Sequence, residues 1–207
     1  MKKFQQTREV IKYSSKYING KTLDLGAGRV KYKSIISKFC DQYVAFDNVA
    51  GKDVNVVGDI LNTSFADESF NTIICTMVFE HIPKPWLAVK EMKRILKKGG
   101  VVIVTAPFIQ SYHQDPEDYY RYTVKGMETL FEDFKIIEAD YYGEFFTTIS
   151  GFIKMHFFNP YKAQDNKKIK SRIKNKIFRM IEKLAKFLDR FIKSDITYIA
   201  SYIIAKK

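Results

Sequence analysis

The sequence has little of what marks secreted or membrane-spanning proteins. Only two of its 207 residues are cysteines, Cys40 and Cys75, which is too few for a disulfide framework. Cys75 lies inside an apolar run, so we expect a small buried thiol and a reducing compartment. No run reaches the ~18 apolar residues of a membrane span, and the first residues lack the apolar core of a secretory signal. We therefore expect a cytoplasmic location.

Acidic residues are scarce in the C-terminal third. The chain carries 35 Lys and Arg against 23 Asp and Glu, a net charge of +12. Residues 162–193 hold 12 of these basic residues and only three acids, so the rest of the chain is near neutral. Apolar residues recur at helical spacing over 166–193, which predicts a long basic amphipathic helix. The preceding segment, 145–161, is aromatic and nearly uncharged.

Four interpretations of the basic helix stay open. The first is a helix packed on the sheet with a solvated charged face. The second is docking on an anionic membrane surface, the third nucleic-acid binding, and the fourth a dimer interface. The second draws on a set of aromatic rings in the preceding segment: Phe145, Phe146, Phe152, Phe157 and Phe158.

The rest of the chain alternates short apolar runs with helical patterns. This alternation predicts a parallel sheet with right-handed crossovers. The strands are expected at 21–25, 42–47, 54–58, 70–77, 101–106, 134–142 and 196–205. The helices are expected at 4–19, 30–39, 84–97 and 123–131, with Thr123 capping the last and Lys97-Lys98 closing the third before Gly99-Gly100.

The most informative motif is Leu23-Asp24-Leu25-Gly26-Ala27-Gly28, at the end of the first expected strand. Its glycines allow a tight turn with little side-chain bulk, so a ligand can lie against the backbone near the next helix. Asp47 ends the second strand, where a carboxylate can accept hydrogen bonds from both ribose hydroxyls. Asp59 follows the third strand. The pattern predicts a crevice for a nucleoside cofactor at the carboxyl ends of the strands.

A nicotinamide dinucleotide fits this motif less well. The fingerprint Gly-x-Gly-x-x-Gly needs a third glycine at position 31, where this chain has Lys31. A dehydrogenase is therefore the weaker interpretation.

Together with Phe79-Glu80-His81-Ile82 and the run from Glu91 to Gly100, these motifs resemble class I S-adenosylmethionine-dependent methyltransferases of the type 11 branch. The resemblance covers about residues 20–142. It implies an α/β, Rossmann-like, seven-stranded and mostly parallel sheet with its last strand antiparallel and helices on both faces. Residues 1–207 would form one domain, with an N-terminal helix in 1–19 and a basic, aromatic helical insertion at 143–193 between strands six and seven. Many members carry a third glycine where this chain has Val30.

The resemblance also implies S-adenosyl-L-methionine as the cofactor. The glycine turn would underlie its methionine part, Asp24 would face its amino group, and Asp47 would hold its ribose. Asp59 would accept from the adenine amine, and Met77 would lie near the sulfonium. The full set implied for the cofactor is Asp24, Gly26, Ala27, Gly28, Asp47, Asn48, Asp59, Ile60, Thr76 and Met77.

Two histidines are candidates for catalysis, because a hydroxyl acceptor must lose a proton and imidazole accepts one near neutral pH. His81 follows the fourth strand and His113 lies in the loop after the fifth. A purely structural role for either stays open. Four residues are candidates for binding the acceptor: Glu80, Asp118, Tyr119 and Arg121. An internal Asp118–Arg121 ion pair that pins the loop is the alternative for two of them.

No metal site is expected. The candidate ligands His81, His113, Asp115 and Glu117 lack a short ligand spacing such as His-x-x-x-His.

The predicted function is methyl transfer to a hydroxyl of a small or lipid-linked, carbohydrate-like acceptor. The stretch from Pro107 to Thr123 resembles a subgroup associated with glycan or cell-envelope biosynthesis. Peripheral contact with an anionic inner membrane surface is part of this prediction; the oligomeric state is open. One alternative is an RNA methyltransferase, favoured by the basic region but not by Thr76-Met77-Val78-Phe79, which lacks an Asn-Pro-Pro-Tyr-type signature. The other is a non-catalytic binding protein with a methyltransferase fold.

Overall fold

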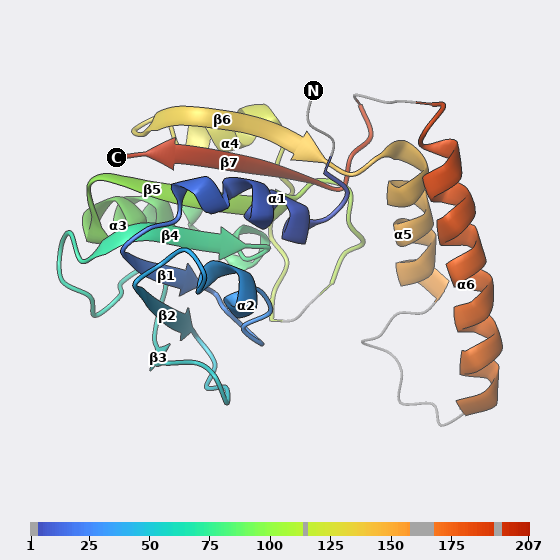
Figure 1. The fold of residues 1–207 in the computed structure, drawn as a ribbon, viewed down its shortest axis with the longest axis horizontal. Helices are drawn as coiled ribbons and strands as arrows, with labels where there is room; N and C mark the ends of the chain where they lie inside the picture. Colours follow the sequence, from blue (N-terminus) through green and yellow to red (C-terminus); the bar gives the residue numbers. More distant parts are fainter. Residues whose placement is uncertain (1–3, 114–115, 158–167, 193–195) are drawn as a thin grey trace.

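A seven-stranded sheet forms the centre of the molecule (Figure 1). The structure, a computed structural model, describes residues 4–113, 116–157, 168–192 and 196–207. The strand order is β3-β2-β1-β4-β5-β7-β6, and β7 runs antiparallel to both β5 and β6 while the other pairs are parallel. The strands are β1 (Lys21–Leu25), β2 (Gln42–Asp47), β3 (Val56–Val57), β4 (Phe70–Thr76), β5 (Leu96–Pro107), β6 (Lys135–Tyr142) and β7 (Ala200–Lys206). The predicted fold class is confirmed.

Helices cover both faces of the sheet (Figure 1). On one face α1 (Thr7–Ser14) and α2 (Lys33–Ile36) pack on Ile74 and Ile103 through Ile11 and Ile36. On the other, α3 (Pro85–Ile95) and α4 (Val124–Leu130) contribute Met92 and Met127 to a second apolar cluster. The central strands are apolar on both faces because both faces are covered.

The third predicted helix ends earlier than the sequence indicated. It stops at Ile95, and Lys97 and Lys98 lie in β5 rather than in a last helical turn. Leu96 is fully buried and pairs with Phe70 of β4. Pairing with a neighbouring strand thus outweighs the local helical pattern, and Gly99, at φ +76°, adopts a backbone that suits glycine.

Several other elements are shorter than predicted. The helix expected at 4–19 is α1 followed by a single 3-10 turn, Ser15–Tyr17, and the one expected at 30–39 keeps only α2. The strand expected at 54–58 is reduced to β3, and β4 ends one residue early, at Thr76. The last strand begins at Ala200 instead of 196. In contrast, Thr123 caps α4 as predicted, accepting a hydrogen bond from Gly126 N at 3.0 Å.

Two helices follow β6 and precede β7. They are α5 (Phe145–Phe157) and α6 (Lys168–Leu188). The helix expected over 166–193 is thus α6, and residues 166–167 and 193 of that range lie outside the described residues. The two helices lie side by side beyond the carboxyl ends of the parallel strands (Figure 1). Since α6 packs on α5 rather than on the sheet, the interpretation of a helix packed on the sheet does not describe it. In the described part of the chain, no helix is both long and apolar enough to cross a bilayer.

Candidate functional site

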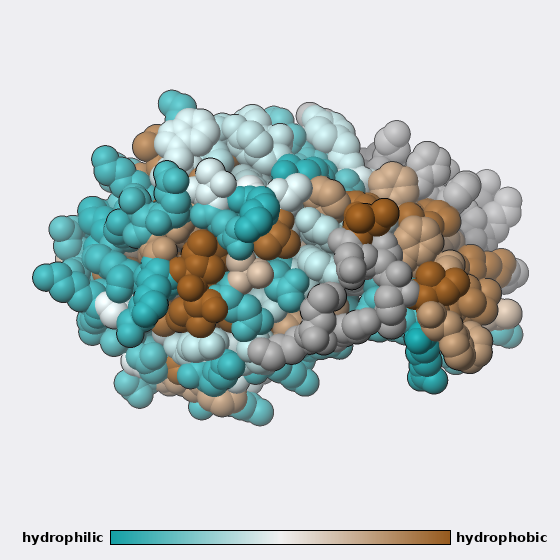
Figure 2. Space-filling view, turned by 90° about the horizontal axis from the view of Figure 1, so that it is seen from above, coloured by the Kyte–Doolittle hydropathy of each residue, from teal (hydrophilic) through white to brown (hydrophobic). Residues whose placement is uncertain are grey.

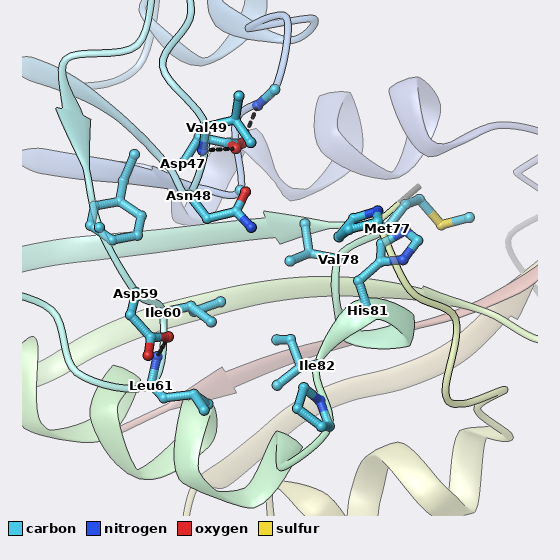
Figure 3. Close-up of a pocket in the computed structure, with 16 residues that line it drawn as sticks. Asp47, Asn48, Val49, Asp59, Ile60, Leu61, Met77, Val78, His81 and Ile82 are labelled. Atoms are coloured by element: carbon cyan, nitrogen blue, oxygen red, sulfur yellow. Dashed lines mark hydrogen bonds between the residues drawn. The ribbon is translucent and has the colours of Figure 1, made fainter. Parts of the chain in front are cut away.

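A hollow of about 560 Å³ opens at the carboxyl ends of β1, β2 and β4 (Figure 3). We call it the carboxyl-edge pocket. Open parallel sheets bind ligands at this edge because the strand ends and the loops after them converge there. Seven of the ten residues predicted for the cofactor line it: Gly26, Gly28, Asp47, Asn48, Asp59, Ile60 and Met77.

The glycine turn forms one wall of the pocket. Gly26 has φ +79°, and a Cβ there would lie 2.4 Å from Val78 Cγ2. Gly28 has φ +53°, but a Cβ there would meet no atom within 4 Å. The turn is held to β2 because Phe46 O accepts hydrogen bonds from Gly26 N at 2.8 Å and Ala27 N at 3.0 Å. The backbone at Gly28 therefore faces open space in which a ligand can lie.

The carboxylates of two strand ends orient neighbouring backbone. Asp47 accepts from Gly28 N at 2.8 Å and from Val49 N at 3.1 Å (Figure 3). Asp59 accepts from Leu61 N at 2.9 Å on the opposite wall. Asn48 projects into the space between these walls (Figure 3). The two acids therefore lie at separate points of one cavity, which suits a ligand with two polar ends.

The other three predicted residues, Asp24, Ala27 and Thr76, are not among the residues that line the pocket. The Asp24 side chain is buried under the turn and accepts a hydrogen bond from the Tyr43 hydroxyl at 2.6 Å. Burial raises the pKa of Asp24 to about 6, although the Tyr43 hydrogen bond opposes this shift. Asp24 thus supports the turn from below in the structure as described.

Two non-glycine residues of this edge have left-handed backbone. Val30 has φ +46°, and Met77 has φ +54°. Such a conformation is unfavourable for a β-branched residue and persists where surrounding contacts impose it. Met77 N donates to Thr105 O at 2.9 Å, which turns the chain sharply at the end of β4. This turn directs the next residues along the pocket wall.

The two candidate catalytic histidines lie next to each other, with ring centroids 5.1 Å apart. His81 lines the carboxyl-edge pocket, whereas His113 is buried outside its lining. His81 Nδ1 hydrogen-bonds the Glu117 backbone carbonyl. Because a carbonyl only accepts, Nδ1 carries the proton and Nε2 of the neutral ring is the basic atom.

A buried carboxylate accompanies these rings. Glu80 Oε1 lies 3.9 Å from His81 Nε2, too long for a hydrogen bond, and Glu80 Oε2 has no hydrogen-bond partner among the described residues. Burial raises the pKa of Glu80 to about 7. Its carboxyl group therefore changes charge near neutral pH, within reach of the imidazole.

Asp118 and Arg121 form an ion pair inside the loop. The Arg121 guanidinium donates to both carboxylate oxygens, one at 2.7 Å, and also to the backbone carbonyls of Gln110 and Ser111. Burial alone would raise the pKa of Asp118, but the hydrogen bonds from Arg121 outweigh it and hold the pKa below its usual range. The alternative of a pinned loop is thus what the structure contains. Tyr119 remains half exposed.

One cluster among the described residues has the composition of a cation site. Glu80, His81 and His113 each offer a ligand atom, and these atoms lie within 4.8 Å of one another. The sequence indicated no such cluster, because the fold brings together residues 32 positions apart. Asp115, one of the weighed ligands, lies outside the described residues. Glu117, another of the weighed ligands, contacts the cluster through its backbone carbonyl, which accepts the hydrogen bond from His81 Nδ1.

Seven apolar residues of the lining were not singled out as pocket residues from sequence. They are Phe46, Val49, Leu61, Val78, Ile82, Pro83 and Pro116. A signal existed for three of them, because Val78, Ile82 and Pro83 flank the Glu80-His81 pair in the motif after β4. Val49 and Leu61 carried none, since they sit in irregular loops whose path only the tertiary structure fixes.

Comparison with known proteins agrees with this geometry. A family model described as a methyltransferase domain matches residues 23–104. Demethylmenaquinone methyltransferase of Staphylococcus haemolyticus is 24% identical over 143 residues, which span 60% of this chain and 60% of that protein. The chain thus aligns with less than two thirds of that relative.

Two solved structures share the fold over almost the whole chain. An S-adenosylmethionine-dependent methyltransferase from Archaeoglobus fulgidus has a TM-score of 0.60 at 16% identity, covering 97% of this chain and 95% of that one. The [4+2]-cyclase SpnF has a TM-score of 0.61 at 12% identity, covering 97% and 80%. At these identities the likeness shows the fold alone, and the cyclase illustrates that this fold supports more than one chemistry.

The sheet order, the glycine turn and the matched family model define a class I methyltransferase fold. Residues 23–104 match the methyltransferase domain family, and the chain has the fold of S-adenosylmethionine-dependent methyltransferases, as its motifs indicated. S-adenosylmethionine is the cofactor that this family and fold support.

Proposed function

We propose that the protein transfers a methyl group from S-adenosylmethionine to a hydroxyl of a carbohydrate-like acceptor. The observation that carries this proposal is the carboxyl-edge pocket, which joins Asp47, the open backbone at Gly28 and the Met77 wall to a histidine. A nucleoside with a charged tail suits such a cavity, because carboxylates and free backbone groups can satisfy its polar ends.

In this proposal the cofactor lies across the pocket. Asp47 would accept from the ribose hydroxyls, and Asp59, with Ile60 beside it, would hold the adenine. The methionine part would follow the turn over Gly26 and Gly28 toward Met77. Asp24 and Ala27 would act from beneath this turn, and Thr76 from the end of β4. Asn48 is well placed to contact either the ribose or the base.

The chemistry requires alignment and removal of one proton. The acceptor oxygen bonds to the methyl carbon while the carbon–sulfur bond breaks, its electron pair going to sulfur, and S-adenosylhomocysteine leaves. Holding the oxygen in line with that bond supplies much of the rate. His81 Nε2 would take the hydroxyl proton, and the buried Glu80 carboxylate would stabilise the resulting imidazolium.

His113 would act as a positioning residue for His81. Its ring packs against the His81 ring, and its own Nδ1 lies 3.2 Å from Ser111 O and 3.4 Å from an Asp118 carboxylate oxygen. The Asp118–Arg121 pair would shape the acceptor side by holding the loop, and the exposed Tyr119 ring would offer a stacking surface to a sugar. This divides the predicted substrate-binding set into one contact residue, Tyr119, and a supporting pair, while Glu80 would serve His81 instead of the acceptor.

The acceptor would be small or attached to a lipid. A lipid-linked acceptor would bring a cytoplasmic enzyme to the inner membrane surface, where it would make peripheral contact with anionic lipid. The position of α5 and α6 beyond the same sheet edge supports this proposal.

The test has three arms. Calorimetry with S-adenosylmethionine and S-adenosylhomocysteine measures donor binding; a well-folded protein that releases no heat with either contradicts the proposal. Transfer of a labelled methyl group is then screened against lipid-linked glycans, free nucleotides and RNA. Label in RNA would support the RNA methyltransferase instead, and binding without turnover on any fraction would support a non-catalytic binding protein. Activity after prolonged dialysis against a chelator decides between His81 as a base and a metal held by Glu80, His81 and His113.

A further inference from the structure

The α5–α6 pair presents many apolar side chains to solvent. On α6 the exposed apolar side chains recur every three or four residues, and the pair of rings Phe187 and Phe191 touch, with centroids 5.1 Å apart. Six of the exposed apolar side chains on α6 and just beyond it have half or more of their surface exposed. The exposed apolar set on α6 and just beyond it is Ile177, Met180, Ile181, Leu184, Phe187, Phe191 and Ile192, joined on α5 by Ile149, Phe152 and Ile153. Figure 2 shows apolar side chains gathered at this end of the molecule.

This surface is not the face by which the two helices meet. The buried residues of the described part of α6 are Ala185 and, just beyond its end, Asp189. At ~100° per residue, Asp189 points away from the exposed apolar arc, which spans about 140°, and Ala185 lies just beyond its edge. An amphipathic helix normally buries such an arc against its own domain. Here six of the seven side chains of the arc are half or more exposed.

Cations line one border of the apolar arc. Lys176, Arg179, Lys183, Lys186 and Arg190 fall in one adjoining sector of the same helical projection. Three of them, Lys176, Arg179 and Lys183, are exposed and form a shallow groove with Met180. Lys186 is partly engaged by Glu182 at 2.7 Å. An apolar arc bordered by Lys and Arg is the pattern of helices that lie in the interface of an anionic bilayer.

The end of α6 is held to the start of α5 by hydrogen bonds. The Asp189 carboxylate accepts from Phe146 N at 2.8 Å and Thr147 N at 3.1 Å, which caps the first turn of α5. The Thr147 hydroxyl also donates to it at 2.8 Å. Because α5 continues directly from β6, this cap couples the apolar surface to the sheet.

We infer that the α5–α6 pair is a membrane-docking device for the anionic surface of a bilayer. Its apolar side chains enter the headgroup and acyl boundary, and the cationic row binds anionic headgroups. The pair connects the carboxyl end of β6 to the start of β7. Both of these strand ends lie on the side of the sheet where the carboxyl-edge pocket opens (Figure 1). Docking therefore brings the pocket near the lipid surface, where an acceptor carried on a lipid resides.

Charge complementarity favours lipid over the other occupants. A second copy would present the same cations and would repel them, whereas an anionic surface neutralises them. RNA would use the cations but would leave the broad aliphatic arc in water, because bases stack on aromatic planes rather than on Ile, Leu and Met. A bilayer satisfies both features at once.

The test is co-sedimentation of the full chain with phosphatidylcholine vesicles prepared with and without phosphatidylglycerol. We expect binding that needs the anionic lipid and weakens in high salt. Arg179→Glu with Lys183→Glu should lower the partition coefficient at least about tenfold, since each cation near such a surface contributes measurably. Lys38→Glu with Lys90→Glu makes the same charge change at two exposed residues of the sheet domain and should leave vesicle binding unchanged.

The apolar half of the device is tested separately. Leu184→Ser with Phe191→Ser should also reduce vesicle binding at least about tenfold, whereas Phe39→Ser, at an exposed ring on the core, should not. Equal vesicle binding by the wild type and by these charge and apolar variants would overturn the inference. So would a shift of the wild type to a dimer that the apolar variants abolish, or tighter binding to single-stranded RNA than to vesicles. S-adenosylmethionine affinity, measured on the same variants, should not change, so failure of docking is distinguishable from failure of the proposed methyl transfer.

Discussion

The Asp47 carboxylate accepts a hydrogen bond from the backbone N–H of Gly28 at 2.8 Å, across 19 residues of sequence. This contact ties the end of β2 to the glycine turn after β1. One side chain therefore both shapes the turn and faces the pocket, so its removal affects the ligand in two ways.

Replacing Asp47 by Ala should weaken S-adenosylmethionine binding by about ten- to a hundredfold. A hydrogen bond to a charged group contributes about 1.5–3 kcal/mol, and the loosened turn adds to that loss. Isothermal titration measures it directly. Asp41→Ala removes the same charge from an exposed site just before β2 and serves as the control. An unchanged dissociation constant for Asp47→Ala would remove this residue from the ribose site.

The two glycines of the turn should separate stability from binding. Gly26→Ala places a methyl group 2.4 Å from Val78 Cγ2 at φ +79°, so it should lower the free energy of unfolding by about 2–5 kcal/mol. Gly28→Ala meets no protein atom and should lower it by only about 1–2 kcal/mol. If the donor lies against Gly28, the second variant should nevertheless lose most of its donor affinity. Urea unfolding and titration calorimetry on both variants provide the comparison.

Val30→Gly should stabilise the protein. Left-handed backbone at a β-branched residue costs about 1–3 kcal/mol, whereas the added chain entropy of glycine costs about 0.5–1 kcal/mol. The net gain should be about 1 kcal/mol in urea unfolding. Val57→Gly, at an exposed position of β3, lacks this strain and should be destabilised instead. A loss of stability in Val30→Gly equal to that of Val57→Gly would show that Val30 carries no strain.

Asp24 should make stability fall as the pH rises from about 4 to 6. Its pKa is about 6 in the folded state against an ordinary value of 3.8, so the folded state holds the extra proton in that range. The slope of the unfolding free energy with pH is negative wherever the folded state binds more protons. The difference between wild type and Asp24→Asn should therefore change by about 2–3 kcal/mol across this window. Asp133→Asn, at an exposed carboxylate, should give a flat difference.

His81→Ala should lower kcat by about 10²–10⁴ while leaving donor affinity nearly unchanged, because the side chain acts on the acceptor proton. The wild-type rate should increase with pH as Glu80, whose pKa burial raises to about 7, loses its proton and can stabilise the imidazolium, and the variant should lose this increase. His113→Ala should reduce kcat less and keep the pH dependence, since it only positions the His81 ring. Loss of the pH profile in the His113 variant alone would exchange the two roles.

The sequence was informative where periodicity and turn chemistry are local. β1 and β2 lie where their apolar runs predicted, and Thr123 caps α4 because a hydroxyl at a helix start satisfies a free N–H. It was less informative where pairing competes with local preference. Lys97 and Lys98 fit a helical pattern yet extend β5, since Leu96 is buried between strands.

The same division applies to the candidate site. Glycines and acids at strand ends are recognisable because the topology of parallel sheets forces those ends to one edge. The direction in which each side chain points cannot be recognised from the sequence. Asp24 faces Tyr43 under the turn instead of the pocket, and the Glu80, His81 and His113 cluster forms only when the loop after β5 folds back onto the end of β4.

The order of residues alone determined the alternation of strands and helices, the bare turn at Gly26 and Gly28, and the amphipathic basic segment, because each depends on neighbours within a few positions. Tertiary structure decided which acids reach the cavity, which histidine borders it, and that α6 leaves most of its apolar arc exposed. Those outcomes depend on contacts between residues distant in the chain, whose energies no local pattern contains.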